Sequence, residues 1–172
     1  MRQGRRDRSG FREFAAGRSG HLYRSACLLT SGDTHLAEDL VQETLGRMYL
    51  LWGRVSRIDN PAAYAQTVLV RAFLTHRRRR SAGERPVGEF PDAQGAAGGA
   101  DPALRLTLLD ALGRLAPKDR AVLVLRYWED RSVEETADAM NASSAAVRTR
   151  STRALARLRE QLGGSLAEFA EL

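Results

Sequence analysis

A stretch rich in glycine, proline and alanine divides the chain and restricts how it can fold. Residues 81–103 contain five glycines and three prolines. Such a segment cannot bury enough apolar surface to offset the conformational entropy lost when it becomes ordered. We therefore expect a flexible linker over residues 81–103, joining two small domains over residues 11–80 and 104–172. The arginine-rich residues 1–10 are expected to form a disordered basic tail.

Both expected domains have the residue pattern of helices. Apolar side chains recur every three or four positions, and neither half shows the alternation typical of strands. The segment from Thr34 to Trp52 is the clearest case, because its apolar residues fall on one arc of a helix and its acidic residues on the opposite arc. Asn60 and Pro61 suit the N-cap and the first position of a further helix. We expect an all-α fold made of two small helical domains.

The second half ends in a helix-turn-helix pattern. Ser132 and Glu135 have the spacing of a capping box at the start of a short helix. Asn141 is the non-glycine residue that best tolerates the left-handed turn expected after that helix. A long helix then runs to about Leu162. With two amphipathic helices expected upstream, the C-terminal domain is predicted to be a four-helix module.

The outward face of this last helix combines arginine with small or hydroxylated side chains. Such a face can enter the major groove of DNA while its guanidinium groups reach bases or phosphates. The alternative is a plain helical hairpin with a solvated basic face. The residues that suit DNA reading are Arg148, Thr149, Thr152 and Arg153.

The charge of the chain favours a polyanionic partner. Its 27 basic residues against 21 acidic ones give a formal net charge of +6, and Lys118 is the only lysine. The arginine guanidinium forms paired hydrogen bonds with phosphates and with guanine edges, which suits nucleic acid. A GC-rich genome is an alternative explanation of the arginine content, and an anionic membrane surface would attract the same charge. The run from Arg77 to Arg80, with Arg71 upstream, is a candidate phosphate contact. At the end of a helix the same run also suits the helix dipole.

The acidic arc of the helix from Thr34 to Trp52 does not fit a protein that only binds DNA, because it repels phosphate. Glu38, Asp39, Gln42 and Glu43 make up this arc. Most such arcs are simply solvated faces. Its width and its concentration of carboxylates nevertheless indicate a docking surface for a basic protein partner.

Several classes of site are not indicated by the sequence. Cys27 is the only cysteine and lies in an apolar run, so we expect a buried thiol and no zinc site built on cysteines. The three histidines lack metal-ligand spacing, and no glycine-rich phosphate loop or catalytic constellation is evident. We expect no metal, no cofactor, no small-molecule substrate and no enzyme activity. Because no run of about 20 apolar residues and no export signal are evident, a cytoplasmic, nucleoid-associated location is expected.

Two segments carry a resemblance to a known family. The run AEDLVQET from Ala37 to Thr44, followed by Trp52 and by NPAAY from Asn60, looks like the second conserved region of extracytoplasmic-function (ECF) sigma factors. Residues 115–159, from LAPKDRAVL through the helix-turn-helix, resemble their fourth region. The match covers about residues 11–80 and 104–162 in the right order, and is closest to the short actinobacterial group.

This resemblance implies a non-catalytic subunit that binds core RNA polymerase, recognises and melts promoter DNA, and has an anti-sigma factor as a candidate partner. Core polymerase would be bound by Asp39, Gln42 and Glu43. The minus-ten element would be contacted by Asn60, Tyr64, Arg71, Arg77, Arg78, Arg79 and Arg80. The minus-thirty-five element would be read by Arg148, Thr149, Thr152 and Arg153.

The chain departs from the family pattern at a few positions. Arg71 and Thr75 stand where the resemblance leads us to expect asparagine and aspartate in the minus-ten segment. Ser151 replaces an apolar residue on the inward face of the last helix, and Asn141 replaces a turn glycine.

Two other functions account for parts of the sequence less well. A stand-alone regulator that binds operators would explain the helix-turn-helix, but not the acidic arc or the segment from Asn60 to Arg80. An invertase-like recombinase or a nucleic-acid hydrolase would need a nucleophile or a metal cluster that the sequence does not indicate.

Overall fold

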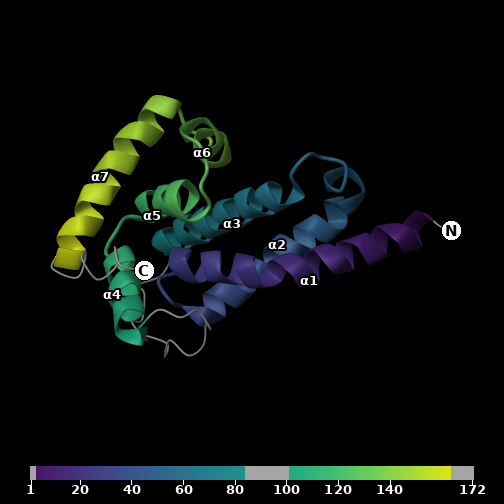
Figure 1. Ribbon diagram of the computed structural model, residues 1–172, viewed down its shortest axis with the longest axis horizontal. Coiled ribbons are helices and arrows are strands. Elements are labelled where there is room, and N and C mark those ends of the chain that lie inside the picture. The colour runs from purple at the N-terminus through teal and green to yellow at the C-terminus, as the bar shows by residue number, and fades with distance from the viewer. Residues whose placement is uncertain (1–2, 84–100, 164–172) are drawn as a thin grey trace.

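The computed structural model describes residues 3–83 and 101–163, and every regular element within those ranges is helical (Figure 1). The elements of the first half are α1 (Gln3–Leu29), α2 (Thr34–Val55) and α3 (Pro61–Gly83). Those of the second half are α4 (Pro102–Gly113), α5 (Pro117–Leu123), the π-helical turn η1 (Val124–Trp128), α6 (Val133–Met140) and α7 (Ser144–Leu162). The predicted all-α fold is confirmed. None of the helices in the described ranges is long and apolar enough to cross a membrane.

The first helix and the linker differ from the sequence-based boundaries. The predicted disordered tail over residues 1–10 is wrong from Gln3 onward, because α1 begins there and continues unbroken to Leu29. Arginine is a good helix former, and each turn added to an existing helix needs no new nucleation. At the predicted linker, α3 continues to Gly83 and α4 begins at Pro102. The rest of the predicted linker, residues 84–100, lies outside the described residues.

The helix α2 buries its apolar arc as predicted. Asp33 caps the helix, since its carboxylate accepts a hydrogen bond from the Leu36 backbone N–H at 3.1 Å. Its buried residues are Ala37, Leu40, Val41, Thr44, Met48, Trp52 and Val55. Two members of the predicted apolar arc are less covered, because Leu45 is half-buried and Leu51 is exposed.

The helix-turn-helix forms with the predicted local chemistry. Ser132 and Glu135 make both hydrogen bonds of a capping box, and Asn141 adopts the left-handed conformation at φ 52° and ψ 48°. Ser143 then caps α7 by accepting from the Ala146 N–H at 3.1 Å. The unusual Ser151 is buried, and its hydroxyl donates to the Val147 carbonyl at 2.7 Å, so its polarity is satisfied.

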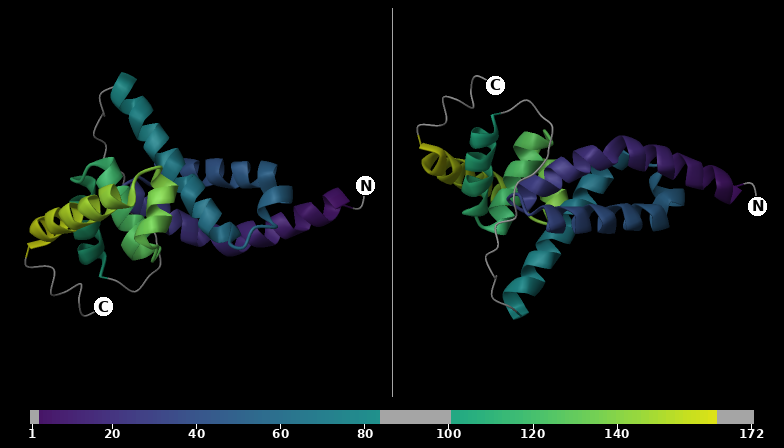
Figure 2. Two further views of the ribbon diagram at one scale, coloured as in Figure 1. Left: turned by 90° about the horizontal axis from the view of Figure 1, so that it is seen from above. Right: turned by 90° about the horizontal axis from the view of Figure 1, so that it is seen from below.

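The two halves share one hydrophobic core, a feature that the sequence does not predict. Ala121, Val124, Leu125 and Ala139 of the second half belong to the same buried cluster as the apolar side chains of α1, α2 and α3. Both views of Figure 2 show the helices of the second half gathered around the C-terminal end of α1, while its N-terminal end projects away. In this structure the two halves therefore pack against each other, whereas the sequence predicts two small domains joined by a flexible linker.

Candidate protein and nucleic-acid interfaces

The acidic arc is a solvent-exposed face of α2. Asp39, Gln42 and Glu43 are all exposed, on the side of the helix opposite the buried arc. Glu43 forms an ion pair with Arg47 one turn later at 2.7 Å, and both side chains are about half exposed. Such a pair contributes little to stability. The arc is thus a solvated surface on a helix whose opposite face is buried, and the cation Arg47 lies beside its carboxylates.

The start of α3 is organised by a cap. The side-chain oxygen of Asn60 accepts a hydrogen bond from the Ala63 N–H at 3.0 Å, which satisfies one of the unpaired donors in the first turn. Tyr64 is half-buried and packs against the shared core. Asn60 and Tyr64 therefore both help to build the helix on which they were predicted to contact DNA.

The basic end of α3 extends toward solvent. Arg78 and Arg79 are exposed, whereas Arg77 and Arg80 are half-buried. The Nη2 group of Arg78 donates to the Thr75 hydroxyl at 3.4 Å. In the interior, burial lowers the pKa of Arg120 to about 10, with a smaller contribution from the like charge of Arg77.

The structure places the guanidinium of Arg71 against the second half of the chain. Its Nε donates to the Ala139 carbonyl and its Nη2 donates to the Asp138 carbonyl, each at 3.0 Å. Both carbonyls lie in the last turn of α6, where carbonyls lack the usual partner within the helix, and that of Asp138 also accepts from the Asn141 N–H at 3.3 Å. Arg71 therefore stabilises the helix-turn-helix from α3, a role that the sequence does not indicate.

The same side of α3 makes further contacts with the second half. Arg131 donates to the Thr67 hydroxyl at 2.8 Å and also to the Ala63 carbonyl. Ala63, Thr67 and Arg71 are spaced by four residues and so lie on one face of the helix. This face of α3, which belongs to the segment predicted to contact the minus-ten element, is therefore in contact with the second half of the protein.

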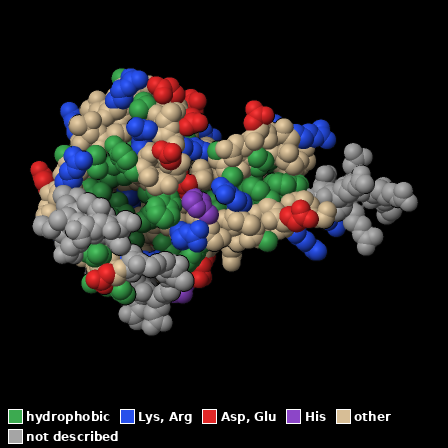
Figure 3. Space-filling view, viewed as in Figure 1, with side chains coloured by type: hydrophobic (Ala, Val, Ile, Leu, Met, Phe, Trp, Pro, Cys, Tyr) green, Lys and Arg blue, Asp and Glu red, His purple; other side chains and the backbone are tan. Residues whose placement is uncertain are grey.

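The predicted reading face of α7 is exposed. Arg148 pairs with Glu134 of α6 at 3.3 Å, and both side chains are more than 60% exposed. The Thr152 hydroxyl donates to the Arg148 carbonyl at 3.1 Å, and Thr149 and Arg153 also face solvent. On the molecular face in Figure 3, basic and acidic side chains of the described residues are interspersed.

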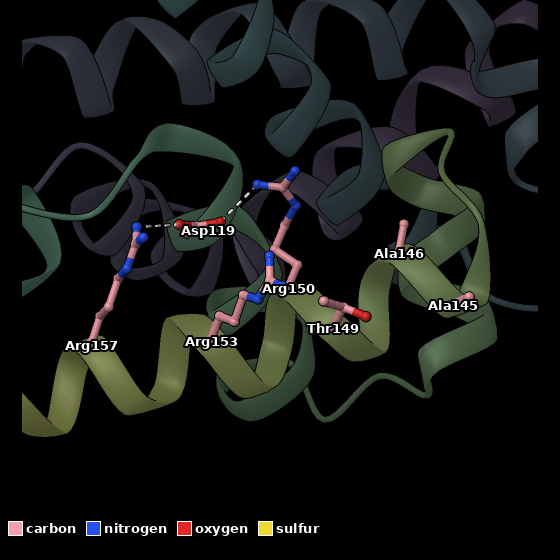
Figure 4. A pocket seen from close by; sticks show the side chains of 7 residues that line it. All are labelled: Asp119, Ala145, Ala146, Thr149, Arg150, Arg153 and Arg157. Atoms are coloured by element: carbon pink, nitrogen blue, oxygen red, sulfur yellow. Dashed lines mark hydrogen bonds and ion pairs between the residues drawn. The ribbon is translucent and has the colours of Figure 1, made fainter.

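An open hollow of about 530 Å³ lies between α5 and α7 (Figure 4). It contains a largely buried carboxylate that the sequence does not single out: Asp119 pairs with Arg150 at 2.7 Å and lies 3.7 Å from Arg157. The residues lining the hollow are Asp119, Ala145, Ala146, Thr149, Arg150, Arg153 and Arg157. The spacing of the three arginines places them on one side of α7, but the sequence gives no signal for Asp119.

Comparison with known proteins decides the family. Residues 18–83 match the family model of Sigma-70 region 2, and residues 111–160 match that of Sigma-70, region 4. An RNA polymerase sigma-E factor of Streptomyces avermitilis is 40% identical over 152 residues, which cover 88% of this chain and 84% of that protein. The chain is an ECF-type member of the sigma-70 family. A probable ECF RNA polymerase sigma factor of Mycobacterium tuberculosis is 31% identical over 81% of this chain and 51% of that one.

Solved structures agree with the fold of this sigma factor. The sigma factor RpoE, in its complex with the anti-sigma factor NepR from Bartonella quintana, is similar with a TM-score of 0.70 and 23% identity, over 90% of this chain and 98% of that one. The acidic arc and the predicted minus-ten residues lie within the part of the sigma factor that matches region 2. The reading face and the hollow lie within the part that matches region 4.

Proposed function

We propose that this sigma factor binds core RNA polymerase and directs promoter recognition, promoter melting and transcription initiation. The single observation that carries the proposal is the presence of both sigma-70 regions, in order, in one chain. A stand-alone operator-binding regulator needs the helix-turn-helix, but such a function does not explain why residues 18–83 match region 2. Its role is non-catalytic, and it acts in the cytoplasm at the nucleoid.

The acidic arc is the proposed docking surface for core polymerase. Asp39, Gln42 and Glu43 are exposed on a helix whose opposite face is buried, so a partner can bind them without disturbing the core. A carboxylate surface steers a basic partner and fixes its orientation. The basic partner in this proposal is the clamp coiled coil of the polymerase.

The proposed contacts with the minus-ten element lie along α3. Asn60 and Tyr64 are at its start, and Arg77, Arg78, Arg79 and Arg80 are at its end. Arg71 is included, although two of its guanidinium N–H groups already donate to the Ala139 and Asp138 carbonyls. The basic end of the helix supplies phosphate contacts, whose strength falls steeply with salt.

The proposed reader of the minus-thirty-five element is the exposed face of α7. Arg148, Thr149, Thr152 and Arg153 project from the helix that follows the left-handed turn at Asn141. In helix-turn-helix proteins this second helix enters the major groove. An anti-sigma factor is a further proposed partner, by analogy with the RpoE complex.

Run-off transcription tests the proposed function. Core polymerase is incubated with fragments of genomic DNA, with and without the protein, and the transcripts are mapped. We expect initiation at a defined set of promoters only when both the polymerase and the protein are present. Tight, sequence-specific binding of duplex by the protein alone, without any effect on initiation, would favour the operator-binding regulator.

A further inference from the structure

The largely buried carboxylate in the hollow between α5 and α7 points to a role beyond the residues named above. We propose that Asp119 is a positioning residue for promoter binding, holding Arg150 and Arg157 in place to contact backbone phosphates beside the reading face. This inference rests on the proposed function and assigns a phosphate-binding role to two arginines outside the predicted set.

The geometry places one carboxylate between two arginines. Asp119 lies in the first turn of α5, and only 12% of its side chain is exposed. One of its oxygens accepts a hydrogen bond from Arg150 at 2.7 Å, and the other lies 3.7 Å from Arg157. The two arginines are seven residues apart, about two turns of α7. Figure 4 shows both of them directed toward Asp119 from α7.

The arginines remain accessible to a ligand. The side chain of Arg150 is 38% exposed and that of Arg157 is 64% exposed. A guanidinium has five N–H donors, and Asp119 accepts only one hydrogen bond from Arg150. Each arginine can therefore bind a second acceptor while its contact with Asp119 holds it in place.

The charge and location of the hollow indicate the chemistry of that ligand. Three arginines and one aspartate line it, so it has an excess of positive charge. Arg153 and Thr149 belong both to the hollow and to the predicted reading face. Because a phosphate oxygen pair matches the arginine fork, a helix that reads base edges would bring backbone phosphates to this hollow.

Holding an arginine side chain in place should strengthen its binding to phosphate. A long, flexible side chain loses conformational freedom when it binds a phosphate, and prior ordering reduces that loss. The Asp119 carboxylate also repels phosphate. The positioning effect and the simple charge effect are therefore opposite in sign, which makes them separable.

The variant Asp119→Asn distinguishes the positioning effect from the charge effect. It raises the net charge of the DNA-binding domain by one, so charge alone predicts tighter binding to DNA. Loss of positioning predicts weaker binding. The matched control is Asp110→Asn, which removes a carboxylate from the second half of the chain, away from α7, where it pairs with Arg114 in a solvent-exposed contact at 3.0 Å. The control is expected to bind DNA as tightly as the wild type or more tightly.

The experiment uses holoenzyme assembled from core polymerase and the full chain, with a promoter fragment that the wild-type holoenzyme transcribes. Affinity is measured at several salt concentrations. We expect Asp119→Asn to bind roughly 2- to 10-fold more weakly, the effect of impairing about one hydrogen bond. We also expect the slope of log affinity against log salt to be shallower by about 1 for each phosphate that the variant no longer binds.

A second variant tests the proposal even if Asp119→Asn fails to fold. Arg150→Lys preserves the charge but removes the fork, at a side chain that is partly exposed. It should weaken binding to a similar extent, and the double variant should be little worse than either single one, because both changes remove one coupled unit. Circular dichroism checks that each variant is helical.

Unchanged or tighter binding by folded Asp119→Asn, with the wild-type salt slope, would overturn the inference and leave Asp119 as a link between α5 and α7. Additive losses in the double variant would overturn it as well. Both results leave the proposed function standing as long as the wild-type holoenzyme initiates transcription. A wild-type protein that never supports initiation would overturn the proposed function and this inference together.

Discussion

Glu129 and His21 lie 108 positions apart in the sequence, and their side chains meet at 2.8 Å in the structure. The Glu129 side chain is only 3% exposed, and it also accepts hydrogen bonds from Ser25 and Gln66. All three partners belong to the first half of the chain, whereas Glu129 directly follows η1 of the second half. One buried carboxylate thus joins helices α1 and α3 to the helix-turn-helix domain.

Replacing Glu129 with alanine should loosen the two halves. The substitution removes three hydrogen bonds to a buried charged group, and each such bond contributes roughly 1.5–3 kcal/mol. Because the effects are not additive and His21 is partly exposed, we expect a total loss of about 2–4 kcal/mol in the free energy of unfolding. Denaturant unfolding measures the loss. Spin labels on α1 and α7 should also show a longer and broader distance distribution.

The matched control for that experiment is Asp110→Ala. Asp110 pairs with Arg114 at 3.0 Å, and both side chains are more than half exposed. Loss of this pair should change stability by less than about 1 kcal/mol. An equal effect of the two substitutions would contradict the role given to Glu129.

Arg120 makes a second link between the halves that depends on the shape of its guanidinium. It is 3% exposed, and it donates to the Leu29 carbonyl at 2.6 Å and to the Leu115 carbonyl at 3.1 Å. Lysine retains the charge but cannot hold the same forked geometry. Arg120→Lys should therefore destabilise the protein by about 1–3 kcal/mol, the cost of leaving a buried carbonyl unsatisfied. Arg114→Lys, at an exposed position directly after α4, is the control, and a comparable loss there would argue against this explanation.

The cap of α6 should make stability depend on pH. The hydrogen bonds that Glu135 makes with Ser132 lower its pKa below the ordinary value of 4.5. A carboxylate with a lowered pKa stabilises the folded state fully above its unfolded-state pKa, and the contribution is lost as the pH falls through the folded-state pKa. The melting temperature of the wild type should therefore exceed that of Glu135→Gln at neutral pH, and the difference should shrink as the pH falls below 4.5. A difference that does not change with pH would contradict this reasoning.

Local features were predictable from the sequence because they depend on neighbouring residues. The capping box at Ser132 and the left-handed Asn141 follow from local hydrogen bonds and backbone preferences, and both are present. The buried arc of α2 follows from helical periodicity. In each case a few adjacent residues determine the outcome.

The contacts between the halves could not be predicted in this way. Helical periodicity identifies which face of α3 is apolar, but not that Arg71 reaches the end of α6. Nothing in the sequence around Glu129 and Asp119 distinguishes these charged residues from surface residues. Their side chains are buried only because of the tertiary arrangement of the helices. The helical start of α1 could not be predicted from charge either, because a run of arginines is compatible with both a disordered tail and a helix.

The reading face of α7 gives a prediction about promoter sequence. Arg148→Ala and Arg153→Ala should each lower promoter use. If the arginine contacts a guanine edge, the loss should be about 1–3 kcal/mol and confined to one position of the upstream element. If it contacts phosphate, all promoters should weaken alike. Selection from a randomised upstream element with each variant distinguishes these cases, and unchanged preference and activity in both variants would remove α7 from promoter reading.

The central claim, that this sigma factor docks on core RNA polymerase through the acidic arc of α2, is tested most directly by reversing the charges of that arc. Asp39→Arg combined with Glu43→Arg places like charges against a basic docking partner, which should cost the complex several kcal/mol. The fold should be retained, because both residues are exposed.

The decisive measurement is co-purification of this folded double variant with core polymerase, beside the wild type and the variant Glu134→Gln. We predict that the wild type and Glu134→Gln assemble with the polymerase, whereas the double variant does not. A folded double variant that still forms an active holoenzyme would contradict the account and show that the acidic arc is only a solvated face.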